Sequence, residues 1–169
     1  MPQPVVRLAA HDDLPRLHAV IERAYRGDSA RAGWTHEADL LDGNRTNAAT
    51  LEASLADPHQ RLLIALGEDA PIGCVQVTDR GDGLCYLGLL CVEPSLQTAG
   101  LGKRLVEAAE DCARDTFGAS TMEMTVIESR TELIAYYERR GYARTLERRD
   151  FPFPVVPPLY MTVLVKSLA

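Results

Sequence analysis

The sequence has no long apolar segment. None of its hydrophobic runs approaches the roughly 20 residues that cross a bilayer. The first residues, Met1-Pro2-Gln3-Pro4, contain no basic region followed by an apolar stretch, so they do not resemble a signal peptide. From both absences we expect a cytoplasmic protein without a membrane partner.

The sequence also lacks the spacings that bind metals. Its histidines are scattered, and no Cys-x-x-Cys pair occurs. Each cysteine lies in an apolar segment, where a free cysteine usually packs as a small hydrophobic residue. These cysteines are Cys74, Cys85, Cys91 and Cys112. The sequence therefore predicts reduced cysteines and no metal site.

Basic residues are not in excess. The chain has 18 Lys and Arg against 24 Asp and Glu, a formal net charge of −6 at pH 7. Nucleic-acid binding needs a basic surface, so we expect no such partner. An acidic protein mildly favours cationic substrates such as amines. The length of 169 residues and the 46% hydrophobic content predict one globular domain over residues 1–169.

What the sequence does contain is a glycine-bearing loop between an apolar strand and a helix. The loop reads Gln97-Thr98-Ala99-Gly100-Leu101-Gly102-Lys103 and opens an expected helix, Leu101–Thr116. The first N–H groups of a helix lack internal partners, and the helix dipole is positive there, so such a loop can hold phosphate. Gly100 and Gly102 would let a pyrophosphate approach the backbone, and Lys103 with Arg104 would add positive charge.

Two common phosphate motifs do not fit this loop. Walker A would need glycine at Gln97 and Ser or Thr at Arg104, and the dinucleotide fingerprint would need glycine at Leu105. What remains is Leu90-Cys91-Val92-Glu93-Pro94-x-x-Gln97-x-x-Gly100-x-Gly102-x-x-Leu105. This pattern resembles motif A of the GNAT acetyltransferases, which grips the pyrophosphate of acetyl-coenzyme A.

The order of expected elements extends the resemblance to nearly the whole chain. Hydrophobic periodicity and turn residues predict strands at Val5–Ala9, Arg61–Gly67, Ile72–Thr78, Leu84–Val92, Thr121–Ile127, Tyr142–Arg149 and Leu159–Val165. They predict further helices at Asp12–Arg26, from Thr46 or Asn47 to about Ala56, and at Arg130–Arg140. We expect Asp12 to cap the first helix, Thr46 or Asn47 the second, and Ser129 the last.

This order resembles the GNAT fold. The resemblance implies an α/β (α+β) architecture, with a mixed, mostly antiparallel sheet of about seven strands and four helices. Strands 4 and 5 would splay apart, and the pantetheine arm of acetyl-CoA would lie between them.

The resemblance also assigns roles on the fourth strand. The Leu90 N–H would point at the thioester carbonyl and stabilise oxyanion charge, and Leu90 and Val92 would pair with the pantetheine amides. Leu90 and Val92 can also be interpreted as core residues. The two interpretations are compatible, because the ligand would be bound by backbone groups while the side chains are buried. Cys91 lies beside the expected thioester, but its side chain should face away from that of Leu90, which argues against an acyl-cysteine.

The segment Tyr136-Tyr137-Glu138-Arg139-Arg140-Gly141-Tyr142 resembles the end of the family's motif B. The resemblance implies that Tyr137 hydrogen-bonds the coenzyme sulfur and protonates the departing thiolate. The alternative is core packing with Leu133 and Ile134. Arg130 stands where many family members have an asparagine that contacts the pantetheine arm, and its role stays open.

No carboxylate stands out as the base for the attacking amine. Glu123 and Glu128 are candidates, although a solvated surface position is more usual for glutamate. Tyr86 could instead order a water molecule that accepts the proton.

In this fold the segment Gly27–Asn47 would cover the acceptor. Trp34 could form a wall or a cation–π face, Glu37 or Asp39 could hold an ammonium group, and Arg45 could bind a carboxylate. The alternative is an amphipathic helix turn with Trp34, Leu40 and Leu41 in the core, and it is an equally good interpretation for each residue alone.

The sequence thus predicts an N-acetyltransferase, a monomer or homodimer. It would transfer the acetyl group of acetyl-CoA to a primary amine of a small molecule, by direct attack in a ternary complex. Two alternatives remain: a protein N-terminal or lysine acetyltransferase, and a non-catalytic acyl-CoA-binding sensor.

Overall fold

The computed structural model describes residues 4–25, 47–68, 70–96, 100–152 and 156–169. Within these ranges seven strands form one sheet in the order β1-β2-β3-β4-β5-β7-β6. The strands are β1 (Val5–Leu8), β2 (Gln60–Leu66), β3 (Pro71–Gly81), β4 (Leu84–Val92), β5 (Thr121–Ile127), β6 (Ala143–Asp150) and β7 (Tyr160–Ser167). The α-helices are α1 (Leu14–Tyr25), α2 (Ala48–Ala56), α3 (Leu101–Phe117) and α4 (Thr131–Arg139). The predicted fold class is confirmed.

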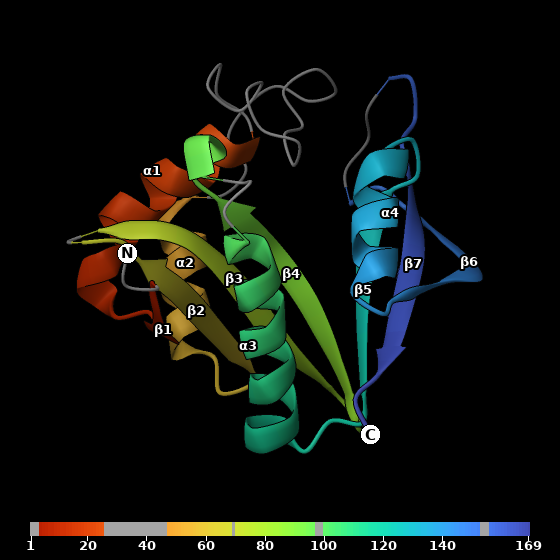
Figure 1. Cartoon of the computed structure of the whole chain (residues 1–169), viewed down its shortest axis with the longest axis horizontal. Helices are drawn as coiled ribbons and strands as arrows, with labels where there is room; N and C mark the ends of the chain where they lie inside the picture. The colour runs from red at the N-terminus through yellow and green to blue at the C-terminus, as the bar shows by residue number, and fades with distance from the viewer. Residues whose placement is uncertain (1–3, 26–46, 69, 97–99, 153–155) are drawn as a thin grey trace.

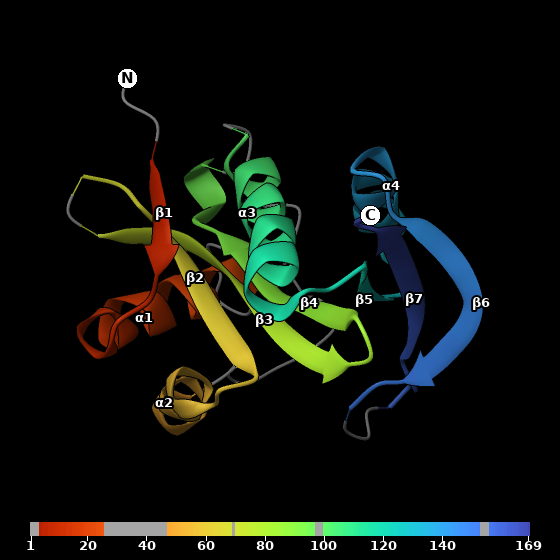
Figure 2. The same cartoon turned by 90° about the horizontal axis from the view of Figure 1, so that it is seen from below.

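The sheet lies between two helical layers. Figure 2 shows α3 and α4 on one face and α1 and α2 on the other. Alternate residues of β2 serve the two layers: Leu63 and Ala65 pack in the core under α3, and Leu62 and Ile64 pack in the core under α1. Because both faces are covered, the central strands read in the sequence as continuous apolar runs.

The strands β4 and β5 are joined only at their beginnings. They pair in parallel over Leu84–Tyr86 and Thr121–Glu123, and then diverge (Figure 1). The sheet therefore consists of an antiparallel half, β1 to β4, and a second antiparallel half, β5-β7-β6. The predicted splay between strands 4 and 5 is confirmed.

A bulge marks the part of β4 that faces the splay. The register with β3 passes from Gln76↔Gly88 to Cys74↔Cys91, which gives β4 one residue more than its partner. Leu89 has a φ of 52° in this bulge, a left-handed conformation that is uncommon for a residue with a branched side chain. The bulge lies directly before Leu90, the residue that sequence reasoning placed at the reacting group.

The helix caps agree only in part with those predicted from the sequence. Asn47 caps α2 as predicted. Ser129 does not cap α4, because the helix begins one residue later and Arg130 is its N-cap, without a side-chain capping bond. A short 3-10 turn precedes α1, and there Asp13 rather than Asp12 accepts a backbone hydrogen bond. Both corrections are shifts of a single residue, which local sequence patterns do not resolve.

A buried carboxylate ties the two halves of the sheet together away from the splay. Glu110 of α3 is 5% exposed; it accepts a hydrogen bond from the Tyr142 hydroxyl at 2.9 Å and from Lys166 Nζ at 3.0 and 3.1 Å. Lys166 of β7 also donates to the Arg140 carbonyl at 2.9 Å. Because α3 packs on β2, β3 and β4, this network connects the first half of the sheet to the second.

Glu110→Ala should lower the free energy of unfolding by about 2–4 kcal/mol, because it leaves the Tyr142 hydroxyl and the Lys166 ammonium without their carboxylate partner. Glu107→Ala, one turn earlier on the exposed side of α3, is the matched control and should change it by less than about 0.5 kcal/mol. Urea unfolding measures both. Equal effects of the two substitutions would contradict the linking role of Glu110.

Candidate active site

The start of α3 presents open space above its first turn. Gly100 has a φ of 78°, and a Cβ there would meet no atom within 4 Å. The position therefore needs glycine for its backbone conformation, and it leaves the first helical N–H groups approachable. A helix start with approachable N–H groups can bind an anion such as a phosphate.

Gly102 is needed for a different reason. A Cβ at this position would lie 2.8 Å from the Tyr136 hydroxyl, so the tyrosine fills the space that a side chain would take. Tyr136 belongs to α4, so this contact joins α4 to the first turn of α3. The two glycines of the motif are thus required by two separate constraints.

Of the two basic residues at this helix start, one is engaged elsewhere in the fold. Leu101 is buried in the core, and Lys103 is exposed on the first turn. Arg104, expected to add charge beside Lys103, instead donates to the Pro4 carbonyl at 2.6 Å.

The residues of β4 alternate as predicted. The side chains of Leu90 and Val92 lie in the core under α3, and that of Cys91 lies in the opposite core under α1. Cys91 contacts Cys74, with 3.4 Å between the sulfur atoms. The Cys91 thiol therefore faces away from the Leu90 side chain. The backbone roles of Leu90 and Val92 stay predictions.

Tyr137 lies in a cluster of aromatic rings on the α3 side of the sheet. It is 6% exposed, and it meets Tyr136 and Tyr142 edge to face, with centroids 5.2 and 6.2 Å apart. Burial raises the pKa of Tyr137, the neighbouring phenols Tyr136 and Tyr86 add to this, and the positive charge of Arg130 opposes it. Tyr137 is thus a protonated hydroxyl within electrostatic reach of Tyr86 and Arg130, and also a core residue.

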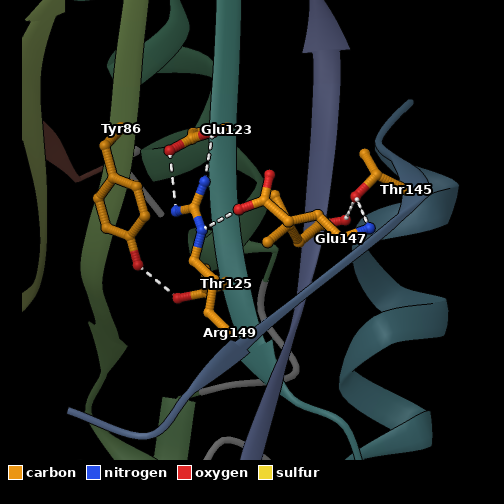
Figure 3. A network of polar contacts seen from close by, with 7 residues as sticks. Tyr86, Glu123, Thr125, Thr145, Glu147 and Arg149 are labelled. Atoms are coloured by element: carbon orange, nitrogen blue, oxygen red, sulfur yellow. Dashed lines mark hydrogen bonds and ion pairs between the residues drawn. The ribbon is translucent and has the colours of Figure 1, made fainter.

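Tyr86 bridges the splayed strands. Its hydroxyl lies 2.5 Å from the Thr125 hydroxyl of β5 (Figure 3). Its ring occupies the space beside Gly88, where a Cβ would come within 3.1 Å of the ring. The phenol ring therefore covers the backbone of β4 at Gly88.

Glu123 is not the solvated residue that its type suggested. It is 7% exposed, and its two oxygens accept from Arg149 at 3.1 and 3.3 Å (Figure 3). Arg149 also donates a hydrogen bond to Glu147. The hydrogen bond to Glu147 and, to a smaller extent, the one to Glu123 raise the pKa of Arg149. Because a guanidinium occupies both of its oxygens, Glu123 is poorly placed to take a proton from an amine.

Glu128, the other candidate base, is held in a similar way. It pairs with Arg148, and this hydrogen bond lowers the pKa of Glu128. A carboxylate with a lowered pKa is a weaker base.

A pocket of about 460 Å³ opens on the face of the sheet that α1 and α2 cover. Elements α2, β2, β3 and β4 line it, and most of its side chains are polar. The lining residues are Thr50, Leu51, Ser54, Gln60, Gln76, Thr78, Arg80, Tyr86, Gly88 and Leu89.

Sequence reasoning identified only Tyr86 among these pocket residues. A signal was present, because Gln76, Thr78 and Arg80 are alternate residues of one strand and place polar groups on one face of an otherwise apolar run. The predicted acceptor residues Trp34, Glu37 and Arg45 lie outside the described residues, as do the loop residues Gln97, Thr98 and Ala99.

Within the described ranges, no group of three or more His, Cys, Asp or Glu side chains is arranged to hold a metal ion. Among the helices of these same ranges, none is long and apolar enough to cross a membrane.

A family model described as "Acetyltransferase (GNAT) family" matches residues 17–142. This match and the splayed sheet define an acyltransferase. The chain belongs to the GNAT acetyltransferase family, as its motifs predicted. No curated protein sequence matches it significantly.

Solved structures share the fold at low sequence identity. The ribosomal-protein-S18-alanine N-acetyltransferase from Escherichia coli is 16% identical with a TM-score of 0.75, over 98% of this chain and 94% of that one. A spermidine N-acetyltransferase chimera of Vibrio cholerae and human sequences is 13% identical with a TM-score of 0.75, over 99% and 96%. YncA from Salmonella typhimurium, a putative acetyltransferase solved with its cofactor acetyl-CoA, is 17% identical with a TM-score of 0.72, over 99% and 95%.

A double-mutant cycle tests why position 102 is glycine. Gly102→Ala should destabilise the protein by about 1–2 kcal/mol, because the new methyl group collides with the Tyr136 hydroxyl. In a Tyr136→Phe background the same substitution should be neutral, or stabilising by up to about 1 kcal/mol, since alanine is the better helix former. Urea unfolding of the four proteins measures the coupling. An equal cost of Gly102→Ala in both backgrounds would exclude the steric explanation.

Proposed function

We propose that the protein is an N-acetyltransferase that transfers the acetyl group of acetyl-CoA directly to a primary amine of a small molecule, in a ternary complex. The observation that carries this proposal is the splay of β4 from β5, with Tyr137 on one face of the sheet and a polar pocket on the other. Donor and acceptor can then approach β4 from opposite sides.

The donor side uses backbone more than side chains. The open space at Gly100 and the start of α3 would hold the pyrophosphate of acetyl-CoA, with Lys103 nearby. Further along the gap, the backbone of Leu90 and Val92 would pair with the pantetheine arm. When bound there, acetyl-CoA supplies an acetyl group activated as a thioester.

Tyr137 would serve as the acid. Its raised pKa keeps the hydroxyl protonated, and the hydroxyl can donate to the leaving sulfur as the carbon–sulfur bond breaks. The positive charge of Arg130 favours the phenolate that this donation would produce. Arg130 would therefore assist Tyr137 instead of contacting the pantetheine arm as the family's asparagine does.

The amine would lose its proton to water. Glu123 and Glu128 are both held by arginines, so neither is offered as the base. The hydroxyl groups of Tyr86 and Thr125 stand at the splay between donor and acceptor sides and could hold a water molecule that takes the proton. Such a site works best with amines that are partly neutral at the working pH.

Isothermal titration should give acetyl-CoA binding at a 1:1 ratio, and Gly100→Glu should weaken it by at least about 100-fold, because a carboxylate would then stand where the pyrophosphate binds. Gly118→Glu is the matched control. Gly118 ends the same helix, is also left-handed with a φ of 64°, and also has open space around a Cβ. It should therefore carry similar strain and leave binding unchanged. Absence of binding to the wild-type protein would refute the proposed function.

Tyr137→Phe should lower kcat by about 100-fold or more and leave the Kd for acetyl-CoA within about twofold, since it removes only the hydroxyl group that would donate the proton. Thiol release and titration measure the two quantities. Tyr160→Phe, a tyrosine of β7 outside this cluster, should change neither. Because the pKa of Tyr137 is raised, wild-type kcat should not fall up to about pH 9. An unchanged kcat in Tyr137→Phe would exclude Tyr137 as the acid.

A further inference from the structure

We propose that Arg80 binds an anionic group of the acceptor, so that the substrate is a primary amine carrying a carboxylate several bonds away. This inference rests on the proposed function, because it names the acceptor class of that reaction. It comes from the described part of the 460 Å³ pocket, and from the charge that this part contains.

Arg80 gives the pocket its charge. The polar residues that line it with Arg80 are hydroxyl and amide side chains, which are Thr50, Ser54, Gln60, Gln76, Thr78 and Tyr86. Within the described lining there is no carboxylate to pair with an ammonium group. The charge of the described lining thus has the opposite sign to the net charge of −6, and a positive charge favours an anion.

The guanidinium of Arg80 is held in place without being neutralised. Arg80 is exposed, and its guanidinium lies over the Tyr86 ring, 4.8 Å from the centroid. This contact uses the face of the guanidinium and leaves its N–H groups for a ligand. In the described ranges no carboxylate lies within 4.0 Å of it.

Other arginines of the chain, unlike Arg80, are paired with carboxylates of the described residues. Several are paired with carboxylates in two-point or close contacts, namely Arg7 with Asp13, Arg23 with Glu93, Arg148 with Glu128, and Arg149 with Glu123. Arg80 offers the same fork of donors to a partner that the described residues do not supply. A carboxylate matches that fork with two parallel hydrogen bonds.

The position of Arg80 also sets the length of the acceptor. The Tyr86 ring beneath the guanidinium lies beside Gly88, which is two residues, or roughly 7 Å of strand, from Leu90. An amine that reaches the thioester near Leu90 while its anion stays at Arg80 must carry the two groups several bonds apart. An ω-amino carboxylate meets this condition, whereas an α-amine adjacent to its own carboxylate is too short.

The same charge selects against polyamines. A diamine of this length would bring its second ammonium group against the guanidinium, with no described carboxylate to compensate. The likeness to a spermidine N-acetyltransferase is therefore a likeness of fold, and we expect the acceptor to differ.

Four amines of equal chain length test the inference: δ-aminovalerate, its phosphonate analogue, n-pentylamine and cadaverine. With acetyl-CoA present, wild-type kcat/KM for δ-aminovalerate should exceed that for n-pentylamine by about 10-fold to 100-fold, with cadaverine the poorest. A phosphonate preferred over the carboxylate would change the anion and overturn the carboxylate assignment.

Variants of Arg80 distinguish two roles of this residue, binding the carboxylate of the substrate and supporting the Tyr86 ring. Arg80→Gln should remove the preference for δ-aminovalerate while n-pentylamine turnover and the Kd for acetyl-CoA stay within about twofold. Arg80→Glu should move the preference to cadaverine. Arg114→Gln removes the same charge from the far half of α3, outside this pocket, and should leave the preference intact. If Arg80 only supports Tyr86, all four amines will lose turnover equally, and the inference is wrong.

Equilibrium binding keeps the test independent of turnover. Titration of δ-aminovalerate into the CoA-saturated protein should give a Kd that weakens by about 10-fold or more in Arg80→Gln. If acetyl-CoA binds and amines are acetylated without a carboxylate preference, the Arg80 inference fails and the proposed function stands. If acetyl-CoA does not bind, the proposed function fails, and titration of δ-aminovalerate into the cofactor-free protein then tests the Arg80 site by itself. A Kd that is undetectable, or unchanged in Arg80→Gln, rejects that site as well.

Discussion

The constraint on which the structure depends is the incomplete pairing of β4 with β5. Two adjacent parallel strands ordinarily satisfy each other's backbone groups along their whole length, yet here the ladder covers only Leu84–Tyr86 on β4. The separation beyond that point is stabilised by the rest of the fold. The bulge at Leu89 bends β4, and Tyr86 reaches across to Thr125 on β5.

Two contacts outside the sheet hold its halves at this separation. At the N-terminal end of α3, the Tyr136 hydroxyl fills the space beside Gly102. Toward the other end of the helix, Glu110 joins Tyr142 and Lys166. Because these contacts lie on α3 and not between β4 and β5, they brace the gap without closing it. If the gap holds acetyl-CoA as proposed, the cross-links must be displaced in this way, since direct pairing of β4 with β5 would fill it.

Local patterns made the central architecture predictable. The alternation around Leu90 and Cys91 follows from the two-residue period of a strand, and the start of α3 follows from its glycine loop. The burial of Glu123 was not predictable, because its partner Arg149 lies on β6 and meets it only through the register of β5, β7 and β6. Glutamate is usually exposed, and only a tertiary contact overrides that tendency.

The pocket residues illustrate a different limit. The polar alternation of Gln76, Thr78 and Arg80 is readable in the sequence, but it does not reveal which face of the sheet it marks. That face is decided by where α1 and α2 pack, and hence by the apolar stripes of both helices. The close approach of Tyr136 to Gly102 is hidden in the same way. A glycine beside a phosphate-type loop already has a sufficient local explanation.

Charge at the site follows local partners and not the overall composition. The chain is acidic, but several of its surface carboxylates are engaged by arginines, as Glu93 is by Arg23 and Glu128 is by Arg148. A carboxylate already paired contributes little field to a distant pocket, because the two charges nearly cancel beyond the pair. An arginine stacked on an aromatic ring keeps its full charge. Among the described residues that line the pocket beside Tyr86, Arg80 is the charged one. The net charge of the whole chain is therefore a poor guide to the charge of this pocket.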